Sequence, residues 1–223
     1  MERIQAMKGV LFDFNGTMFL DTPLHFRAWK VFIREQLGRE FSDSDRELLL
    51  RIANNRSILP HLFPGKTEEE ILVLSEKKEA EYREQCRKAP ELFHLTPGLE
   101  DLLDRWTARG IPMAIATCAC KSNVEFYFEE MGLRRWFPRE RVVCDGENVP
   151  GKPDPTIYRL AAESIGIKPE DCCVFEDSPH GFLAARNAGV QEIYAVTGSF
   201  SREELEKNPL VTRVLDDFRD FDL

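Results

Sequence analysis

Short runs of apolar residues without polar alternation recur along the chain, and several of them end in an acidic or hydroxyl residue. Five such runs cover residues 9–14, 112–117, 142–145, 172–177 and 192–196. Runs of four to six apolar residues are typical of strands that are buried on both faces of a parallel sheet. Helix-like stretches separate the last four runs, at 121–131, 154–165 and 179–188. The alternation predicts right-handed βαβ units and an α/β fold with a Rossmann-like, doubly wound parallel sheet.

A long insertion interrupts this alternation between the first and second runs. Asp13 and Thr117, each at the end of a predicted strand, are 104 positions apart, which is far more than an ordinary crossover. The segment between them has helical patterning at 23–37, 43–53, 67–88 and 97–109. We therefore expect a helical cap at about 18–90, inserted into a core formed by residues 1–17 and 91–223. A ligand at the carboxyl ends of the strands would lie under this cap.

Composition excludes several classes of protein. The net charge of −9 argues against a nucleic-acid-binding protein, which usually has a basic face. No apolar run approaches the roughly 18 residues needed to cross a membrane, and the polar segment 1–8 does not resemble a secretion signal. We therefore expect a cytoplasmic protein that binds neither nucleic acid nor membrane, with its cysteines reduced. The oligomeric state is left open, and a monomer is compatible with the sequence.

Polar side chains follow the predicted strands, where a parallel sheet presents its ligand site. They belong to Asp13, Asn15, Thr117, Glu176 and Asp177, and Lys152 lies in a turn-rich segment that enters a helix. Three carboxylates that converge in a dry site repel one another, and a hard divalent cation such as Mg²⁺ relieves that repulsion. A lysine and a threonine beside the metal suit a phosphate group. Each residue alone has an ordinary alternative, a polar side chain at a strand end or in a loop, but together they predict a site for a divalent cation and a phosphate group.

These residues also carry a resemblance to a known family. Asp13–Thr17, Thr117, Lys152 and Glu176–Gly181 resemble the four ordered motifs of the haloacid dehalogenase superfamily. The segment His25–Lys30 resembles the start of the helical cap in its β-phosphoglucomutase-like branch. The resemblance covers essentially the whole chain.

The resemblance implies a role for each matching residue. Asp13 matches a nucleophile that forms an aspartyl-phosphate. Thr117, with the backbone N–H of Cys118, matches the group that holds the transferring phosphoryl group, and Lys152 matches the cation that neutralises it. The implied Mg²⁺ ligands are Asp13, Asp177, Glu176 directly or through water, and the main-chain carbonyl of Asn15.

Asn15 departs from the family pattern. The family normally has a second aspartate at this position, which protonates the leaving oxygen and later deprotonates the attacking group. An amide cannot exchange that proton near neutral pH, and the loss of general acid–base catalysis typically costs on the order of 10²–10⁴ in rate. Three explanations stay open: a natural variant with a slower or relocated acid, a binding protein that has lost turnover, or an engineered trap.

The cap is expected to determine substrate choice. His25 and Trp29 lie one helical turn apart on the same side of a predicted helix. Arg56 and Lys78 match cap positions that contact a sugar phosphate in the mutase branch. The alternatives are apolar packing for Trp29 and solvated surface charge for Arg56 and Lys78. In the segment 63–67, which ends like a nucleotide-binding loop, we expect Thr67 to cap a helix instead.

The leading functional hypothesis is an Mg²⁺-dependent phosphatase that hydrolyses a small phosphomonoester, with a sugar phosphate as the expected substrate. A β-phosphoglucomutase-type phosphotransferase is the alternative. The second alternative is non-enzymatic, a phosphometabolite-binding protein with a vestigial site. Phosphonate hydrolysis is disfavoured because Arg56, in the predicted cap loop 53–57, cannot form the required imine. Dehalogenation is disfavoured because it does not need the acidic pair Glu176 and Asp177.

Overall fold

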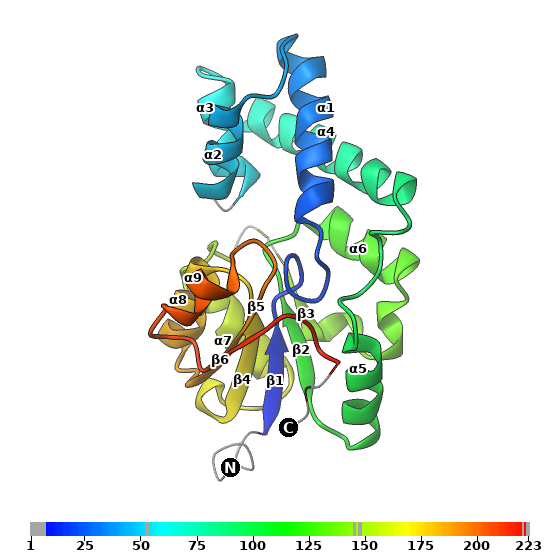
Figure 1. Cartoon of the computed structure of the whole chain (residues 1–223), viewed down its shortest axis with the longest axis vertical. Helices are drawn as coiled ribbons and strands as arrows, with labels where there is room; N and C mark the ends of the chain where they lie inside the picture. The colour runs from blue at the N-terminus through cyan, green and yellow to red at the C-terminus, as the bar shows by residue number, and fades with distance from the viewer. Residues whose placement is uncertain (1–7, 52–53, 145, 147–148, 220, 222–223) are drawn as a thin grey trace. The chain divides into compact units, whose positions relative to one another are not determined.

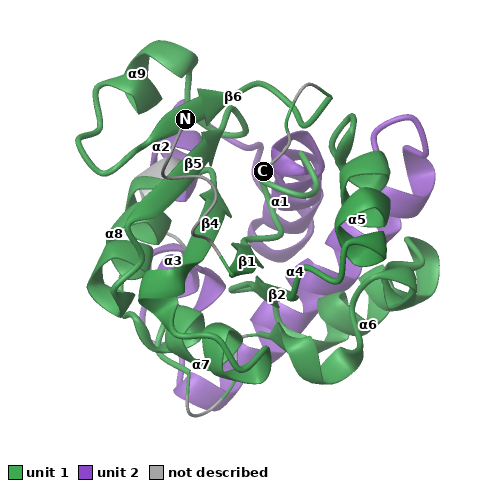
Figure 2. Ribbon diagram, turned by 90° about the horizontal axis from the view of Figure 1, so that it is seen from below, with its two compact units in different colours: residues 1–20, 94–223 green, residues 21–93 purple. Residues whose placement is uncertain are grey.

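A six-stranded parallel sheet forms the centre of one of the two compact units of the chain. The computed structural model describes residues 8–51, 54–144, 146, 149–219 and 221. One unit comprises residues 1–20 and 94–223, and the other comprises residues 21–93 (Figure 2). The strands of the first unit are β1 (Gly9–Phe12), β2 (Met113–Ala116), β3 (Val142–Val143), β4 (Cys172–Glu176), β5 (Glu192–Val196) and β6 (Arg213–Leu215). Their order in the sheet is β3-β2-β1-β4-β5-β6, which is the predicted doubly wound arrangement.

Helices cover both faces of this sheet (Figures 1 and 2). They are α5 (Leu99–Ala108), α6 (Lys121–Glu130), α7 (Thr156–Ser164), α8 (Pro179–Ala188) and the short α9 (Arg202–Glu206). Short 3₁₀ helices lie at Leu133–Arg135, Arg139–Arg141 and Pro169–Asp171. Helices α7 and α8 lie on one side of the sheet, and α5 and α6 lie on the other.

Strand β1 shows why the apolar runs lack alternation. Leu11 packs in a cluster with residues of α7 and α8 such as Tyr158 and Phe182. Its neighbour Phe12 points to the opposite face, where its ring lies 6.1 Å from that of Trp106 on α5 and 5.1 Å from that of Phe175 on β4. Because successive side chains point to opposite faces, a strand with helices on both sides needs apolar residues at every position.

Four of the strands, β1 to β4, are shorter than the apolar runs that predicted them. Asp13, Thr117 and Asp177 each follow the last residue of a strand, although the predicted runs included them. The backbone N–H of Asp13 still donates to Phe175 O at 2.9 Å, and that of Thr117 donates to Val143 O at 2.9 Å. The side chains of the predicted site therefore stand where sheet pairing ends. The sequence interpretation missed β6 and α9, and Asp145 lies outside the described residues.

The second unit is helical. It contains α1 (Thr22–Leu37), α2 (Asp43–Arg51), α3 (Asn55–Leu62) and α4 (Glu68–Lys88), and its described residues form no strand. Thr67 caps α4 as expected: its side chain accepts from Glu70 N, while the Glu70 carboxylate accepts from Thr67 N.

The prediction of a loop at 53–57 was wrong where that segment is described. Asn54 caps α3 by accepting from Ser57 N at 2.9 Å, so Arg56 lies in the first turn of a helix. The interior Pro60 had obscured this helix in the sequence. Ala53 lies outside the described residues. The placement of a cap over the core stays a prediction.

Among the described residues, no helix combines the length and apolar character needed to cross a membrane.

Candidate active site

The loop that follows β1 places Asp13 beside the end of β4. Asp13 is 6% exposed and directly follows the last residue of β1. Gly16 turns the loop with φ of +81°, a conformation that side-chain-bearing residues rarely adopt. A Cβ atom at Gly16 would also overlap the carboxylate of Asp177. Glycine at this position therefore permits the close approach of the β1 loop to the end of β4.

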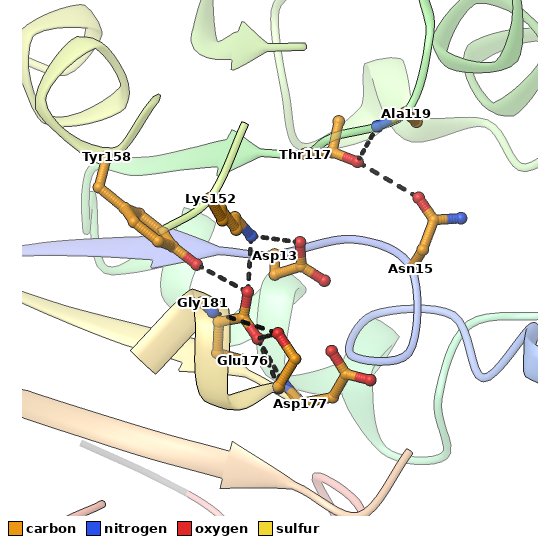
Figure 3. Close-up of polar contacts among 10 residues, drawn as sticks. Asp13, Asn15, Thr117, Ala119, Lys152, Tyr158, Glu176, Asp177 and Gly181 are labelled. Carbon is orange, nitrogen blue, oxygen red and sulfur yellow. Dashed lines mark hydrogen bonds and ion pairs between the residues drawn. The ribbon is translucent and has the colours of Figure 1, made fainter. Parts of the chain in front are cut away.

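Lys152 joins two carboxylates at the centre of the site (Figure 3). Its Nζ donates to Asp13 Oδ1 and to Glu176 Oε1, both at 2.6 Å. The ammonium also lies 4.9 Å from the ring centroid of Tyr158, whose hydroxyl donates to Glu176 Oε1 at 3.3 Å. Burial alone lowers the pKa of Lys152, but the charges of Asp13 and Glu176 outweigh it and raise the pKa well above its ordinary value. The lysine is therefore held in its charged form.

The start of α8 fixes the second oxygen of Glu176. This Oε2 accepts from the backbone N–H groups of Asp177 and Ser178, both at 2.7 Å, and from Ser178 Oγ at 3.1 Å. A Cβ atom at Gly181 would overlap the Glu176 carboxylate, so the helix must present a glycine there (Figure 3). Glu176 is thus oriented by donors on both of its oxygens.

Three buried carboxylates lie close enough together to hold a metal ion. Asp13, Glu176 and Asp177 each offer an oxygen, and these oxygens lie within 4.8 Å of one another. With Lys152 as the only cation in this group of four described side chains, two negative charges are in excess. Burial, and then the charges of Glu176 and Asp13, raise the pKa of Asp177 well above its ordinary value. A site that is rich in oxygen ligands and carries an excess of negative charge fits a divalent cation. The contribution of the Asn15 main-chain carbonyl stays a prediction.

Thr117 lies at the end of β2 on the same edge of the sheet. Its hydroxyl accepts from Ala119 N at 3.0 Å and donates to Asn15 Oδ1 at 3.2 Å (Figure 3). The following residue, Cys118, has no hydrogen-bond partner for its backbone N–H among the described residues. Burial raises the pKa of the Cys118 thiol, which argues against a thiolate in the site. Thr117 and Cys118 therefore present a hydroxyl and a backbone N–H next to one another.

Asn15 has a partner that sequence reasoning missed. Its Nδ2 donates to the hydroxyl of Tyr127 on α6 at 2.9 Å. Tyr158, which supports Glu176, was missed as well, and Ser178 was included in the motif Glu176–Gly181 without a role of its own. Tyr127 and Tyr158 lie in helices whose sequence pattern indicated only packing, so no sequence signal pointed to the site.

The predicted substrate-binding residues of the cap all belong to the helical unit. Trp29 is 3% exposed and packs in the apolar cluster of that unit, and Arg56 is exposed. Lys78 is 1% exposed, so its alternative interpretation as a solvated surface charge is wrong. Its Nζ donates to Glu79 Oε1 and to His25 Nδ1, both at 2.8 Å. The binding of substrate by these four residues stays a prediction.

Comparison with known proteins gives matches over most of the chain. Residues 7–189 match the model of a hydrolase family described as haloacid dehalogenase-like. The chain is 32% identical to hexitol phosphatase A of Escherichia coli over 94% of its length and 92% of the relative. It is 30% identical to the β-phosphoglucomutase of Bacillus subtilis, over 82% of this chain and 81% of that one.

A solved structure shows the same fold over nearly the whole chain. A family IA haloacid dehalogenase hydrolase from Entamoeba histolytica superposes with a TM-score of 0.90 at 29% identity, over 97% of this chain and 96% of that chain. The predicted fold and the predicted likeness to the β-phosphoglucomutase-like branch are both confirmed. The chain belongs to the haloacid dehalogenase-like hydrolase family.

Proposed function

We propose that this enzyme is an Mg²⁺-dependent phosphatase that hydrolyses a small phosphomonoester through an aspartyl-phosphate at Asp13. The observation that carries the proposal is the pairing of Asp13 Oδ1 with the buried ammonium of Lys152 at 2.6 Å, on the same sheet edge as the hydroxyl of Thr117. A carboxylate paired with a buried cation, with a hydroxyl on the same edge of the sheet, suits attack on a phosphorus atom and neutralisation of the phosphoryl oxygens.

In the first step an oxygen of Asp13 attacks phosphorus, and the bond between phosphorus and the leaving oxygen breaks. Lys152 orients Asp13 through their ion pair and neutralises phosphoryl charge, while the Thr117 hydroxyl and the Cys118 N–H bind phosphoryl oxygens. The leaving oxygen takes a proton from solvent, because the Asn15 amide cannot supply one. In the second step a water oxygen attacks phosphorus and the bond between phosphorus and the Asp13 oxygen breaks. Phosphate leaves, the proton of the water passes to phosphate or solvent, and the Asp13 carboxylate is restored.

The residues present fit an Mg²⁺ ion, as the excess of two negative charges and the raised pKa of Asp177 indicate. Asp13, Asp177, the Asn15 main-chain carbonyl and Glu176, directly or through water, would hold it. When bound, the ion supplies Lewis-acid stabilisation of charge on the transferring phosphoryl group. Because both oxygens of Glu176 already accept hydrogen bonds, we assign this residue to the positioning of Lys152 in addition to the ion site.

A phosphorylated sugar or sugar alcohol is the substrate we propose. The support is the likeness to a phosphatase named for hexitol phosphates over more than nine-tenths of both chains. We assign recognition of the sugar to His25, Trp29, Arg56 and Lys78 of the helical unit. A mutase is less well supported, because it must exchange a proton with a sugar hydroxyl in both half-reactions and Asn15 removes the usual group for that exchange. A location in the cytoplasm remains a prediction.

The test is phosphate release from a panel of sugar phosphates and an aryl phosphate, measured with and without Mg²⁺. We expect slow, Mg²⁺-dependent release by the natural chain and none by Asp13→Asn, with Asp171→Asn, a carboxylate paired with the exposed Lys8, as the matched control. Asn15→Asp is expected to raise kcat, on the order of 10²-fold or more for substrates with a poor leaving group. If neither the natural chain nor Asn15→Asp releases phosphate from any ester, the enzymatic hypothesis is wrong and the binding-protein alternative gains support.

A further inference from the structure

A continuous chain of hydrogen bonds links Tyr127 to the expected phosphate-binding hydroxyl. Ala119 N donates to Thr117 Oγ1, Thr117 Oγ1 donates to Asn15 Oδ1, and Asn15 Nδ2 donates to the hydroxyl of Tyr127. All four residues belong to the unit that contains the sheet. The side chain of Asn15 therefore has one partner at its carbonyl end and another at its amide end.

Packing fixes the position of the Tyr127 hydroxyl. Tyr127 is 1% exposed, and its ring stacks on that of Phe14 with a centroid distance of 4.5 Å and an interplanar angle of 28°. Its ring also meets that of Phe19 edge-on at 6.2 Å. Phe14 precedes Asn15 in the chain, so the same loop that carries Asn15 also holds the tyrosine ring. The hydroxyl is thus a fixed point against which the Asn15 amide is oriented.

The chemistry of the three side chains allows two arrangements. A terminal amide has one donor end and one acceptor end, whereas each hydroxyl both donates and accepts. In the arrangement observed, the single proton of Thr117 Oγ1 is directed at Asn15. If the amide turns over, Asn15 Nδ2 donates to Thr117 Oγ1 and Tyr127 donates to Asn15 Oδ1, so the Thr117 proton is released for a phosphoryl oxygen. Both arrangements keep a hydrogen bond from Asn15 to Thr117 and one to Tyr127, and a carboxylate at position 15 could form neither arrangement because it has no donor end.

We propose that Tyr127 is a positioning residue that supports both orientations of the Asn15 amide. The Thr117 proton is thereby directed at Asn15 in the free protein and at a phosphoryl oxygen in the phosphate-bound protein. The inference rests on the proposed function, since it takes Thr117 as a phosphoryl ligand. In this proposal the role of Asn15 is to orient the Thr117 proton, and that role does not require Asn15 to transfer a proton.

The test uses inorganic phosphate as the probe, with Mg²⁺ present. In the natural chain, we expect phosphate to shift the NMR signals of the Asn15 side-chain amide, which are assigned by their loss in Asn15→Asp. In Tyr127→Phe, neither orientation keeps its partner at the far end, so phosphate affinity should fall by about 2- to 10-fold, the equivalent of one neutral hydrogen bond. KM for a phosphate ester should rise by a similar factor with a smaller change in kcat.

Tyr194→Phe is the matched control. Tyr194 is a buried tyrosine on β5, and its hydroxyl makes no hydrogen bond to another described residue. We expect this variant to bind phosphate as the natural chain does. Unchanged Asn15 signals on phosphate binding, or a Tyr127→Phe variant with natural phosphate affinity, would overturn the proposal.

If Tyr127→Phe fails to fold, the response of the Asn15 side-chain NMR signals to phosphate in the natural chain still tests the proposal. Failure of this inference is also distinguishable from failure of the proposed function. A natural chain that hydrolyses esters without any response of Asn15 refutes only the role of Tyr127. A chain that binds phosphate with the Asn15 response but hydrolyses nothing refutes only the phosphatase, and a chain that binds no phosphate refutes both.

Discussion

Each of the two units buries one lysine among carboxylates. The two clusters differ in how their buried negative charge is compensated. In the sheet unit, Lys152 lies between Asp13 and Glu176, with Asp177 beside them. These four side chains carry two negative charges in excess. The raised pKa of Asp177, caused by burial and by the neighbouring carboxylates, is the electrostatic consequence.

The cluster in the helical unit is satisfied by its own donors. Lys78 Nζ donates to His25 Nδ1, so the ring must carry its proton on Nε2, which lies 3.2 Å from Asp21 Oδ2. Tyr82 donates to the same Asp21 oxygen at 2.5 Å, and its ring stacks on that of His25 at 4.0 Å. Glu79 Oε1 accepts from Lys78 at 2.8 Å and from Asn55 Nδ2 at 2.6 Å. Each carboxylate here has neutral donors in addition to any charge partner.

The difference indicates which cluster is built for stability and which for chemistry. Hydrogen-bond donors compensate a buried carboxylate without any added ion. In the sheet cluster neutral donors also reach Glu176, but one lysine faces three carboxylates, against one lysine and two carboxylates in the helical cluster. A bound cation would neutralise the larger excess of negative charge in the sheet cluster. We infer that the sheet cluster is a functional site whose stability depends on its ligand, whereas in the helical unit Asp21, Tyr82 and Glu79 form a scaffold that holds His25 and Lys78 without an added ion.

Replacement of the two lysines should give the largest contrast. Lys152→Met removes the cation that Asp13 and Glu176 share, and the loss of one partner from a buried ion pair typically costs about 3–5 kcal/mol. Lys78→Met should cost less, about 1–3 kcal/mol, because Asn55 still donates to Glu79 after the ammonium is removed. Urea unfolding without Mg²⁺ measures both values. An equal or larger loss in Lys78→Met would contradict the comparison.

The stability of the protein should depend on pH and on Mg²⁺ through Asp177. Because folding raises the pKa of Asp177 above its ordinary value of 3.8, the folded metal-free protein binds a proton more tightly than the unfolded chain. The stability from this group is present at acid pH and is lost as pH rises from the unfolded pKa toward the folded pKa. Asp177→Asn, which imitates the protonated form, should therefore be more stable than the natural chain at neutral pH without metal.

Binding of Mg²⁺ should offset the loss of stability that the ionised Asp177 causes in the natural chain. At about 100 times its dissociation constant it should stabilise the protein by about 2.7 kcal/mol. Asp177→Asn should lose most of that gain, while Asp171→Asn should keep it. Thermal unfolding across pH, with EDTA or Mg²⁺, provides the measurement. A natural chain whose stability is insensitive to Mg²⁺ would count against the ion site.

Tyr82→Phe should give the smallest of these effects. It removes the hydroxyl that donates to Asp21 but leaves the stacked ring and the second donor, His25. A hydrogen bond to a charged group typically contributes about 1.5–3 kcal/mol to stability. We therefore expect the free energy of unfolding to fall by about 1.5 kcal/mol. The loss should be independent of Mg²⁺, since the cluster belongs to the helical unit. Denaturation with and without Mg²⁺, with Tyr194→Phe as the control, tests this; a loss that Mg²⁺ reverses would contradict a scaffold role.

Much of the fold could be predicted from the sequence because its strands are buried on both faces. A parallel sheet needs apolar residues at every strand position, so β1, β2, β4 and β5 appear as uninterrupted apolar runs. The edge strand β6 lacks that signal, since Arg213 is exposed and only two of its residues are buried. Helix α3 was hidden by Pro60, which usually excludes a helix interior.

The charged residues of the site could be predicted, but their supporting partners could not. Asp13, Lys152, Glu176 and Asp177 come together as the strand ends and turn signals indicated. Tyr127 and Tyr158 look like ordinary core residues of amphipathic helices in the sequence. Only the packed structure shows where a buried hydroxyl points, because that depends on the ring contacts around it. The buried position of Lys78 was missed for the same reason.

The most direct test of the central claim is to look for the phosphoryl group on Asp13. The protein is mixed with an aryl phosphate and Mg²⁺, quenched in acid within the first turnovers, digested, and examined by mass spectrometry. Because Asn15 cannot activate water for the second step, we expect the intermediate to accumulate and the peptide that contains Asp13 to carry one phosphoryl group, which Asp13→Asn should lack. Release of phosphate at the natural rate by Asp13→Asn, or rapid turnover with no phosphorylated Asp13 at any time, would contradict the account.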